Sequence, residues 1–152
     1  MLEFMKRYLY VWVFLLAPLA MRAAAIVPLN EITQVTVTFE SSETFEAALD
    51  AARTAAIADG TGHISFKVVM GEGVTGFSAS DLTTLLNYST GKWQGTGTVN
   101  GYDLSATDLT TLPSTCVLDY FSTVSLPSTI TAIPSGAFRT GSNLLEANFN
   151  GA

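Results

Sequence analysis

Alternation of polar and apolar residues indicates where the first strand of the chain lies. In ITQVTVTFE (Ile32–Glu40), Val35, Val37 and Phe39 recur at every second position, so their side chains share one face. A later run, HISFKVVM (His63–Met70), has the length and the β-branched residues of a second strand. The pattern predicts two strands joined by a longer segment.

That segment has the period of a helix. Ser41 or Ser42 is the predicted N-cap, and Gly60 is the predicted C-cap. Glu43 and Glu46 fall in the first turn, where the helix dipole favours carboxylates. The inward stripe comprises Phe45, Ala48, Leu49, Ala52, Ala55 and Ala56. Because most of the stripe is alanine, we expect the helix to lie close against a sheet, in a β-α-β unit over about residues 32–70.

One short segment occurs twice. SASDLTTL (Ser78–Leu85) recurs further along the chain as SATDLTTL (Ser105–Leu112), and the copies differ only where Ser80 is replaced by Thr107. Each copy places Ser three positions before Asp, the spacing of a capping box, so Asp81 and Asp108 are predicted capping acids. The first copy is predicted to form a short helix, and the second, which runs into Pro113, a turn.

Short apolar–polar–apolar triplets recur at nearly equal spacing in the second half of the chain. They are Tyr102-Asp103-Leu104, Val124-Ser125-Leu126 and Ala147-Asn148-Phe149. Strands at that interval predict stacked coils of a solenoid, each adding one short strand to a parallel sheet.

The last coil, VSLPSTITAIPSGAFRTGSNLLEANF, resembles the leucine-rich repeat of the bacterial BspA-like type. The matching residues are Leu126, Pro127, Ile130, Ile133, Ala137, Phe138 and Leu144. Gly141 stands where that family often has Cys, and Phe149 replaces a strand aliphatic. The stretch before it, VNGYDLSATDLTTLP, resembles the preceding coil, and residues 32–98 resemble, more weakly, the α/β opening segment of such surface proteins. An animal-type extracellular I-P-x-G-A-F repeat is the alternative, and it implies the same solenoid.

The N-terminal segment, 1–25, has the pattern of a secretory signal peptide. Lys6 and Arg7 precede an apolar run from Tyr8 to Met21, and Ala23-Ala24-Ala25 supplies an A-x-A cleavage site. A membrane span needs about 20 apolar residues, more than this run contains, so an uncleaved anchor is the less favoured alternative. After Ala25, four basic residues face twelve acidic ones. That balance repels phosphate backbones and disfavours nucleic acid as a partner.

The segment GEGVTG (Gly71–Gly76) matches the G-x-G-x-x-G pattern of a dinucleotide-binding turn. Such a turn needs the helix N-terminus at the glycines, whereas the predicted N-cap is Ser78. Glu72 would sit beside the phosphates, and no acid lies about 20 residues on to bind a ribose. We therefore predict a turn and no nucleotide site.

Residues for other catalytic or metal chemistry are scarce. The chain has one His (His63), expected in solvent, and one Cys (Cys116), expected as a buried side chain without a disulfide. A zinc site needs three or four such ligands, and no G-x-S-x-G motif occurs. Asp81, Asp103 and Asp108 could pair as carboxylates, but capping explains two of them. We predict no catalytic residue, no cofactor and no metal.

Aromatic residues offer one further alternative. Trp93, Tyr102, Tyr120 and Phe121 could form a sugar-stacking surface, although core packing is the favoured interpretation. Asn87-Tyr88-Ser89 is a glycosylation sequon, to which we give no weight in a bacterial protein.

Together these patterns predict an α/β fold: an N-terminal β-α-β unit followed by a short, incomplete leucine-rich repeat solenoid with a small parallel sheet. The predicted divisions are a signal peptide (1–25), an α/β capping segment (26–98) and a repeat segment (99–152). The resemblance implies a secreted or cell-surface protein that binds a host or microbial protein and is not an enzyme. The alternative is a carbohydrate-binding accessory module. Because the sequence stops at LLEANFNGA without a polar capping repeat, we expect either further repeats or self-association through that edge.

Overall fold

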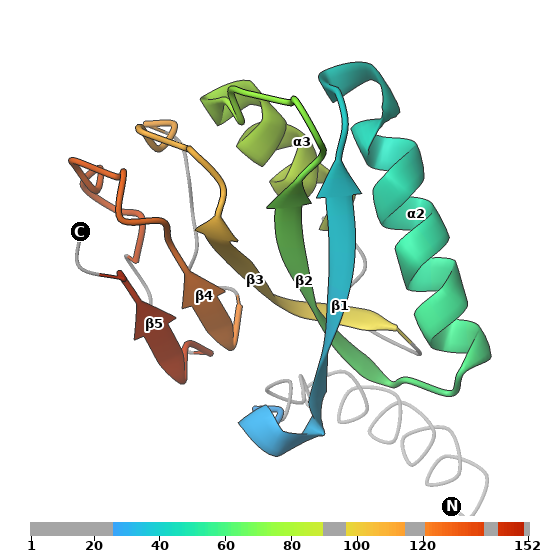
Figure 1. Cartoon of the computed structure of the whole chain (residues 1–152). Helices are drawn as coiled ribbons and strands as arrows, with labels where there is room; N and C mark the ends of the chain where they lie inside the picture. The colour runs from blue at the N-terminus through green and yellow to red at the C-terminus, as the bar shows by residue number, and fades with distance from the viewer. Residues whose placement is uncertain (1–25, 90–96, 115–120, 139–142, 151–152) are drawn as a thin grey trace, which may run out of the picture.

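The computed structural model describes residues 26–89, 97–114, 121–138 and 143–150. The elements in chain order are η1 (Leu29–Glu31), β1 (Ile32–Phe39), α2 (Ser42–Ala58), β2 (His63–Met70), α3 (Ala79–Ser89), β3 (Thr98–Ala106), β4 (Thr123–Ser125) and β5 (Glu146–Asn148). All five strands are parallel and form one sheet in the order of the chain (Figure 1). The fold is therefore mixed α/β, as predicted. The predicted signal peptide lies outside the described residues.

The predicted β-α-β unit is present. Helix α2 begins after the N-cap Ser41 and ends at Ala58. Its C-cap is Asp59 and not the predicted Gly60, which follows with a φ of 80°, the left-handed conformation typical of the residue after a C-cap. Phe45 and Leu49 of its inward stripe are buried. The prediction for Ala55 was wrong, because this residue is exposed on the flank of the helix.

The triplets of the second half lie in register across the sheet. Tyr102 of β3 pairs with Val124 of β4, and Val124 pairs with Ala147 of β5. From Tyr102 the row continues in the opposite direction, through Phe66 of β2 to Val35 of β1. Each triplet lies in a parallel strand, as predicted, although β3 is nine residues long and only β4 and β5 are short, and one apolar row runs through all five strands.

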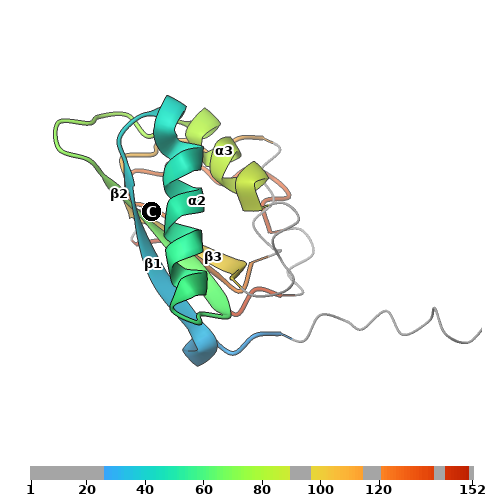
Figure 2. The same cartoon turned by 90° about the vertical axis from the view of Figure 1, so that its right-hand side faces the viewer.

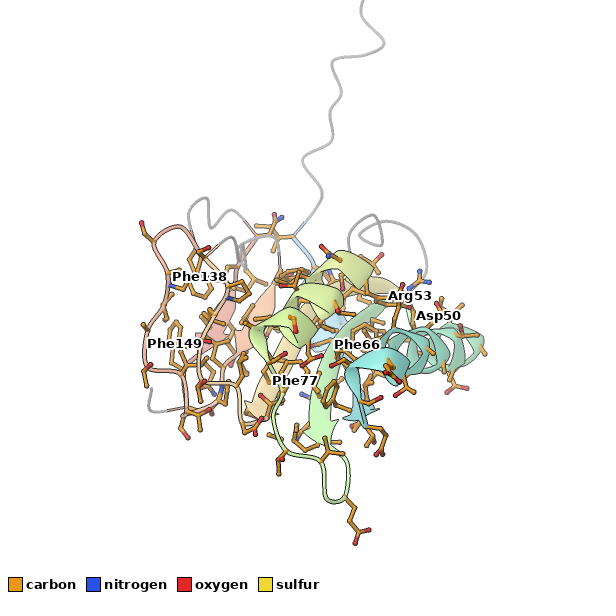
Figure 3. All side chains as sticks on the ribbon, turned by 90° about the horizontal axis from the view of Figure 1, so that it is seen from above. Asp50, Arg53, Phe66, Phe77, Phe138 and Phe149 are labelled. Carbon is orange, nitrogen blue, oxygen red and sulfur yellow. The ribbon has the colours of Figure 1, made fainter. Side chains whose placement is uncertain are left out.

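Both helices cover the same face of the sheet (Figure 2). Between helices and sheet, Phe39, Phe45 and Phe77 meet edge to face, with ring centroids 5.0–5.6 Å apart. Figure 3 shows Phe66 and Phe77 in this layer, and Phe138 and Phe149 near the last strand. In the described part of the chain, no helix covers the opposite face of the sheet, which is unusual because parallel sheets are generally covered on both faces.

The predicted boundary between residues 98 and 99 falls inside β3. This strand pairs with β2 on one side and with β4 on the other, so one sheet joins the two halves of the chain. None of the helices in the described ranges is both long and apolar enough to cross a membrane.

Candidate binding surface

The glycine loop between β2 and α3 binds a carboxylate that belongs to the protein itself. The N–H groups of Gly76 and Phe77 donate to the two oxygens of Asp108, at 2.7 and 2.6 Å. Gly76 has a φ of 94°, which a residue with a side chain rarely adopts. Backbone N–H groups in such a loop are the groups that would bind a phosphate. Here they hold Asp108, which supports the prediction that GEGVTG is a turn.

Asp108 does not have the role that its local spacing predicted. Ser105 and Ala106 of its segment end β3, and residues 107–112 form neither helix nor strand, while the carboxylate of Asp108 binds the preceding loop. Ser105, the expected capping partner, instead donates its N–H and hydroxyl to Asp103. The N–H groups of Phe77 and Gly76 hold the pKa of Asp108 below its usual value. The bond connects the second copy of the repeated segment to the entrance of the first.

Removing this carboxylate is expected to loosen the loop. We expect Asp108→Ala to lower the free energy of unfolding by about 1 kcal/mol, because two charge-assisted hydrogen bonds at an exposed site are lost. Hydrogen exchange at the Gly76 and Phe77 amides should become faster, which NMR can measure. Glu72→Gln, an exposed change in the same loop, is the matched control. Unchanged exchange at both amides in Asp108→Ala would contradict the assignment.

The first copy forms a capping box, as predicted. Ser78 donates its N–H to Asp81 at 2.8 Å, and its hydroxyl accepts the N–H of Asp81 at 3.3 Å. The other oxygen of Asp81 accepts the hydroxyl of Ser42, at the first turn of α2, at 2.6 Å. Burial alone would raise the pKa of Asp81, but the hydrogen bonds from Ser42 and Ser78 outweigh it and the pKa is lowered. Asp81 thus joins the N-termini of both helices.

The bare face of the sheet, here called the open face, bears mostly polar side chains in rows across the strands. One row pairs Thr36, Lys67, Asp103, Ser125 and Asn148 in successive strands. The next row consists of Gln34, Ser65, Gly101, Thr123 and Glu146. All members of the first row are exposed or half-buried. The arrangement offers hydroxyl, amide and charged groups on a broad surface that helices do not cover.

Hydrogen bonds fix part of this surface. The amide nitrogen of Gln34 on β1 donates to Asp103 on β3 at 3.1 Å, so the bond passes over β2. The other oxygen of Asp103 is held by Ser105. Asp103 is therefore oriented from two sides. No motif indicated this surface, and its only signal was the polar half of each strand alternation.

His63 lies at the beginning of β2 and is half-buried rather than free in solvent. Its Nδ1 is 3.0 Å from the side-chain oxygen of Asn100. Asn100 is the extra residue of β3 at a bulge, where the register moves from Ile64–Val99 to Ser65–Gly101. The pair connects the first residue of β2 to β3, and we assign it no chemistry.

Two of the four candidate stacking residues lie in the core. Tyr102 and Phe121 are 1% and 3% exposed, and their rings meet edge to face at 4.5 Å. They are therefore not part of a sugar-binding surface, and core packing explains them. Trp93, Tyr120 and Cys116 lie outside the described residues. Asn87 of the sequon is exposed on α3.

Asp81, Asp103 and Asp108 do not form a shared site, since each has its own partners. Within the described ranges, no three His, Cys, Asp or Glu side chains gather to hold a metal ion. Comparison of the chain with family models, curated proteins and solved structures gave no match. The resemblance to BspA-like repeats therefore depends on the residues quoted above, and the open face is the strongest candidate for a functional surface.

Proposed function

We propose that this chain is an exported recognition protein of the BspA-like leucine-rich repeat type, without catalysis, and that its open face binds a protein partner. The observation that supports this most directly is the open face itself: a parallel sheet whose strands follow chain order and whose helices cover only one side. Short parallel strands that lie in register and recur at nearly equal spacing agree with a solenoid that begins at β3. Export through the segment 1–25 belongs to the same proposal.

The composition of the open face supports recognition over catalysis. Its groups are hydroxyls, amides, Lys67 and the acids Asp103 and Glu146, and Asp103 is already held by Gln34 and Ser105. Such a surface can form many hydrogen bonds with a partner. Solenoid proteins use extended sheet surfaces of this kind for binding.

A carbohydrate ligand is the second candidate, because a hydroxyl- and amide-rich face also suits sugar hydroxyls. The burial of Tyr102 and Phe121 removes two of the aromatic rings on which a sugar could stack. Among the described residues, the open face presents no aromatic platform, which favours a protein partner.

The test compares one face with the other. Thr36 and Ser125 lie on the open face, so the double variant Thr36→Arg/Ser125→Arg should weaken partner binding at least tenfold. Thr54→Arg, on the exposed side of α2, should leave it unchanged. The probes are an array of purified extracellular proteins and, in parallel, an array of glycans. Saturable binding to glycans alone would replace this proposal with the carbohydrate alternative, and equal loss in both variants or binding to neither array would overturn it.

A further inference from the structure

Among the strands that the structure describes, β1 is an outer strand of the sheet, and alternate residues direct their backbone groups away from the sheet. The carbonyl of Phe39 accepts the N–H of Gly71, on the side of β2. Because backbone groups of successive strand residues point to opposite sides, those of Gln34, Thr36 and Thr38 point toward the free edge. Each supplies one donor and one acceptor, in the geometry that pairs with another extended chain.

This edge lacks the features with which proteins usually protect such strands. From Ile32 to Phe39 there is no charged residue, no proline and no glycine. All eight residues pair with β2 without a register shift, so no bulge bends the strand away. The opposite edge, β5, is only three residues long. Of the two edges, β1 is therefore the one built to accept a strand.

Helix α2 provides a flat wall beside this edge. One flank of α2 faces α3, since Asp50 accepts the hydroxyl of Tyr88 and Arg53 donates to the carbonyl of Gly97. The other flank consists of Ala48, Ala51, Ala52 and Ala55, which follow one another at helical spacing. Figure 2 looks onto this side of the molecule, where β1 and α2 lie next to each other. Small side chains there leave room for larger ones from a partner strand.

The charges at this edge indicate the chemistry of the partner. Glu31 and Glu40 are exposed at the two ends of β1, and the carboxylate of Glu40 lies against Gly71, at the end of β2. In the ranges that the structure describes, the basic residues are Arg53, on the flank that faces α3, and Lys67, on β2. An uncharged strand bracketed by carboxylates complements a segment with an uncharged middle and basic ends.

We propose that the free edge of β1 binds an extended polypeptide segment with uncharged β-branched residues in its middle and Lys or Arg at its ends. Backbone hydrogen bonds to Gln34, Thr36 and Thr38 would provide affinity, and the terminal carboxylates would provide selectivity. This site uses outward backbone groups of β1, whereas the open face uses side chains, and its test does not depend on the partner proposed there.

The probe is a fluorescein-labelled peptide of sequence KTVTVTK, with ETVTVTE as the charge control. We expect saturable binding of KTVTVTK, at least tenfold weaker binding of ETVTVTE, and NMR shifts with slower hydrogen exchange at the Gln34, Thr36 and Thr38 amides. Thr36→Pro removes an outward N–H that β2 does not use and should weaken binding at least tenfold, whereas Thr36→Val should not.

A peptide N-methylated at alternate residues tests the same bonds on the unchanged protein, so the result does not depend on the folding of Thr36→Pro. Two such peptides can be made, with N-methyl groups on the odd or on the even residues. We expect one of the two to lose binding, because only one set of peptide N–H groups faces β1. Three results would overturn the proposal: equal affinity for both peptide charges, peptide-induced shifts confined to strands β2 to β5, or protection of these amides that grows with protein concentration alone. The last result would indicate pairing of β1 with a second copy of the chain.

Discussion

The Gly101→Ala variant is expected to lower the free energy of unfolding by about 3 kcal/mol, at the upper end for an overpacked core position. A β-carbon at this position would collide with the carbonyl oxygen and the methyl group of Thr123 on β4, and would also approach the hydroxyl of Ser65. A side-chain end can rotate away, but the carbonyl belongs to the backbone of the neighbouring strand. The collision can be relieved only by separating β3 from β4.

That separation matters because β3 joins the two halves of the sheet. Its pairing with β4 extends over only three residues of each strand, from Gly101–Thr123 to Asp103–Ser125. We therefore expect Gly101→Ala to release the segment beyond residue 121 while the β-α-β unit persists. Urea unfolding followed by NMR amide signals should show the β4 and β5 amides lost at lower urea than those of β1 and β2.

Two variants make this expectation specific. Gly62→Ala is the matched control, because a β-carbon there meets no atom within 4 Å, and its stability should stay within about 0.5 kcal/mol of the original. Thr123→Ser removes the methyl group but leaves the carbonyl, so the double variant Gly101→Ala/Thr123→Ser should not recover. Recovery, or an unchanged stability of Gly101→Ala, would show that the strands adjust at little cost.

The sequence predicted the elements whose pattern is local. Period-two alternation identified β1, helical spacing identified α2, and the capping spacing of Ser78 and Asp81 identified the first turn of α3. The triplets identified the rows of β3, β4 and β5, because nearly equal spacing in parallel strands brings equivalent residues side by side.

Features that depend on contacts between distant segments were not predictable. Asp108 has the same local spacing as Asp81, yet its partners are the N–H groups of Gly76 and Phe77, far earlier in the chain. Gly101 is one glycine among twelve, and only the approach of Thr123 distinguishes it. Ala55 fits the inward stripe by spacing, but it is exposed on the flank of α2. On that side of β1 the described sheet has no further strand that could cover it.

The open face was also beyond sequence reasoning, for a related reason. Alternation shows that one face of each strand is polar, but not whether a further layer covers that face. The arrangement of α2 and α3 on the same side decides it, and this depends on the handedness of both connections. The candidate functional surface therefore exists only in the assembled sheet, and no sequence motif marks it.

The Asp81→Ala variant is expected to lower the free energy of unfolding by about 2 kcal/mol, since it removes a buried charged acceptor that the first turns of both helices share. Asp81 is 2% exposed and accepts the hydroxyl of Ser42, the N–H of Ser78 and the hydroxyl of Ser78. Its loss removes the cap of α3 and the connection to α2 at once. Asp81→Asn, which keeps one oxygen, should cost about 1 kcal/mol.

The pH dependence of stability distinguishes the contribution of the Asp81 charge from that of its side-chain packing. The pKa of Asp81 in the folded protein lies below its ordinary value of 3.8, so the carboxylate stabilises the fold above that pH. This contribution should disappear as the pH falls below about 4 and through the lowered folded pKa. In Asp81→Asn the group no longer titrates, so urea unfolding between pH 2.5 and pH 6 should show a shallower loss of stability on the acid side. A variant that lost stability with the same slope as the original protein would show that other carboxylates cause the acid sensitivity, and that Asp81 joins the two helices by packing and not by its charge.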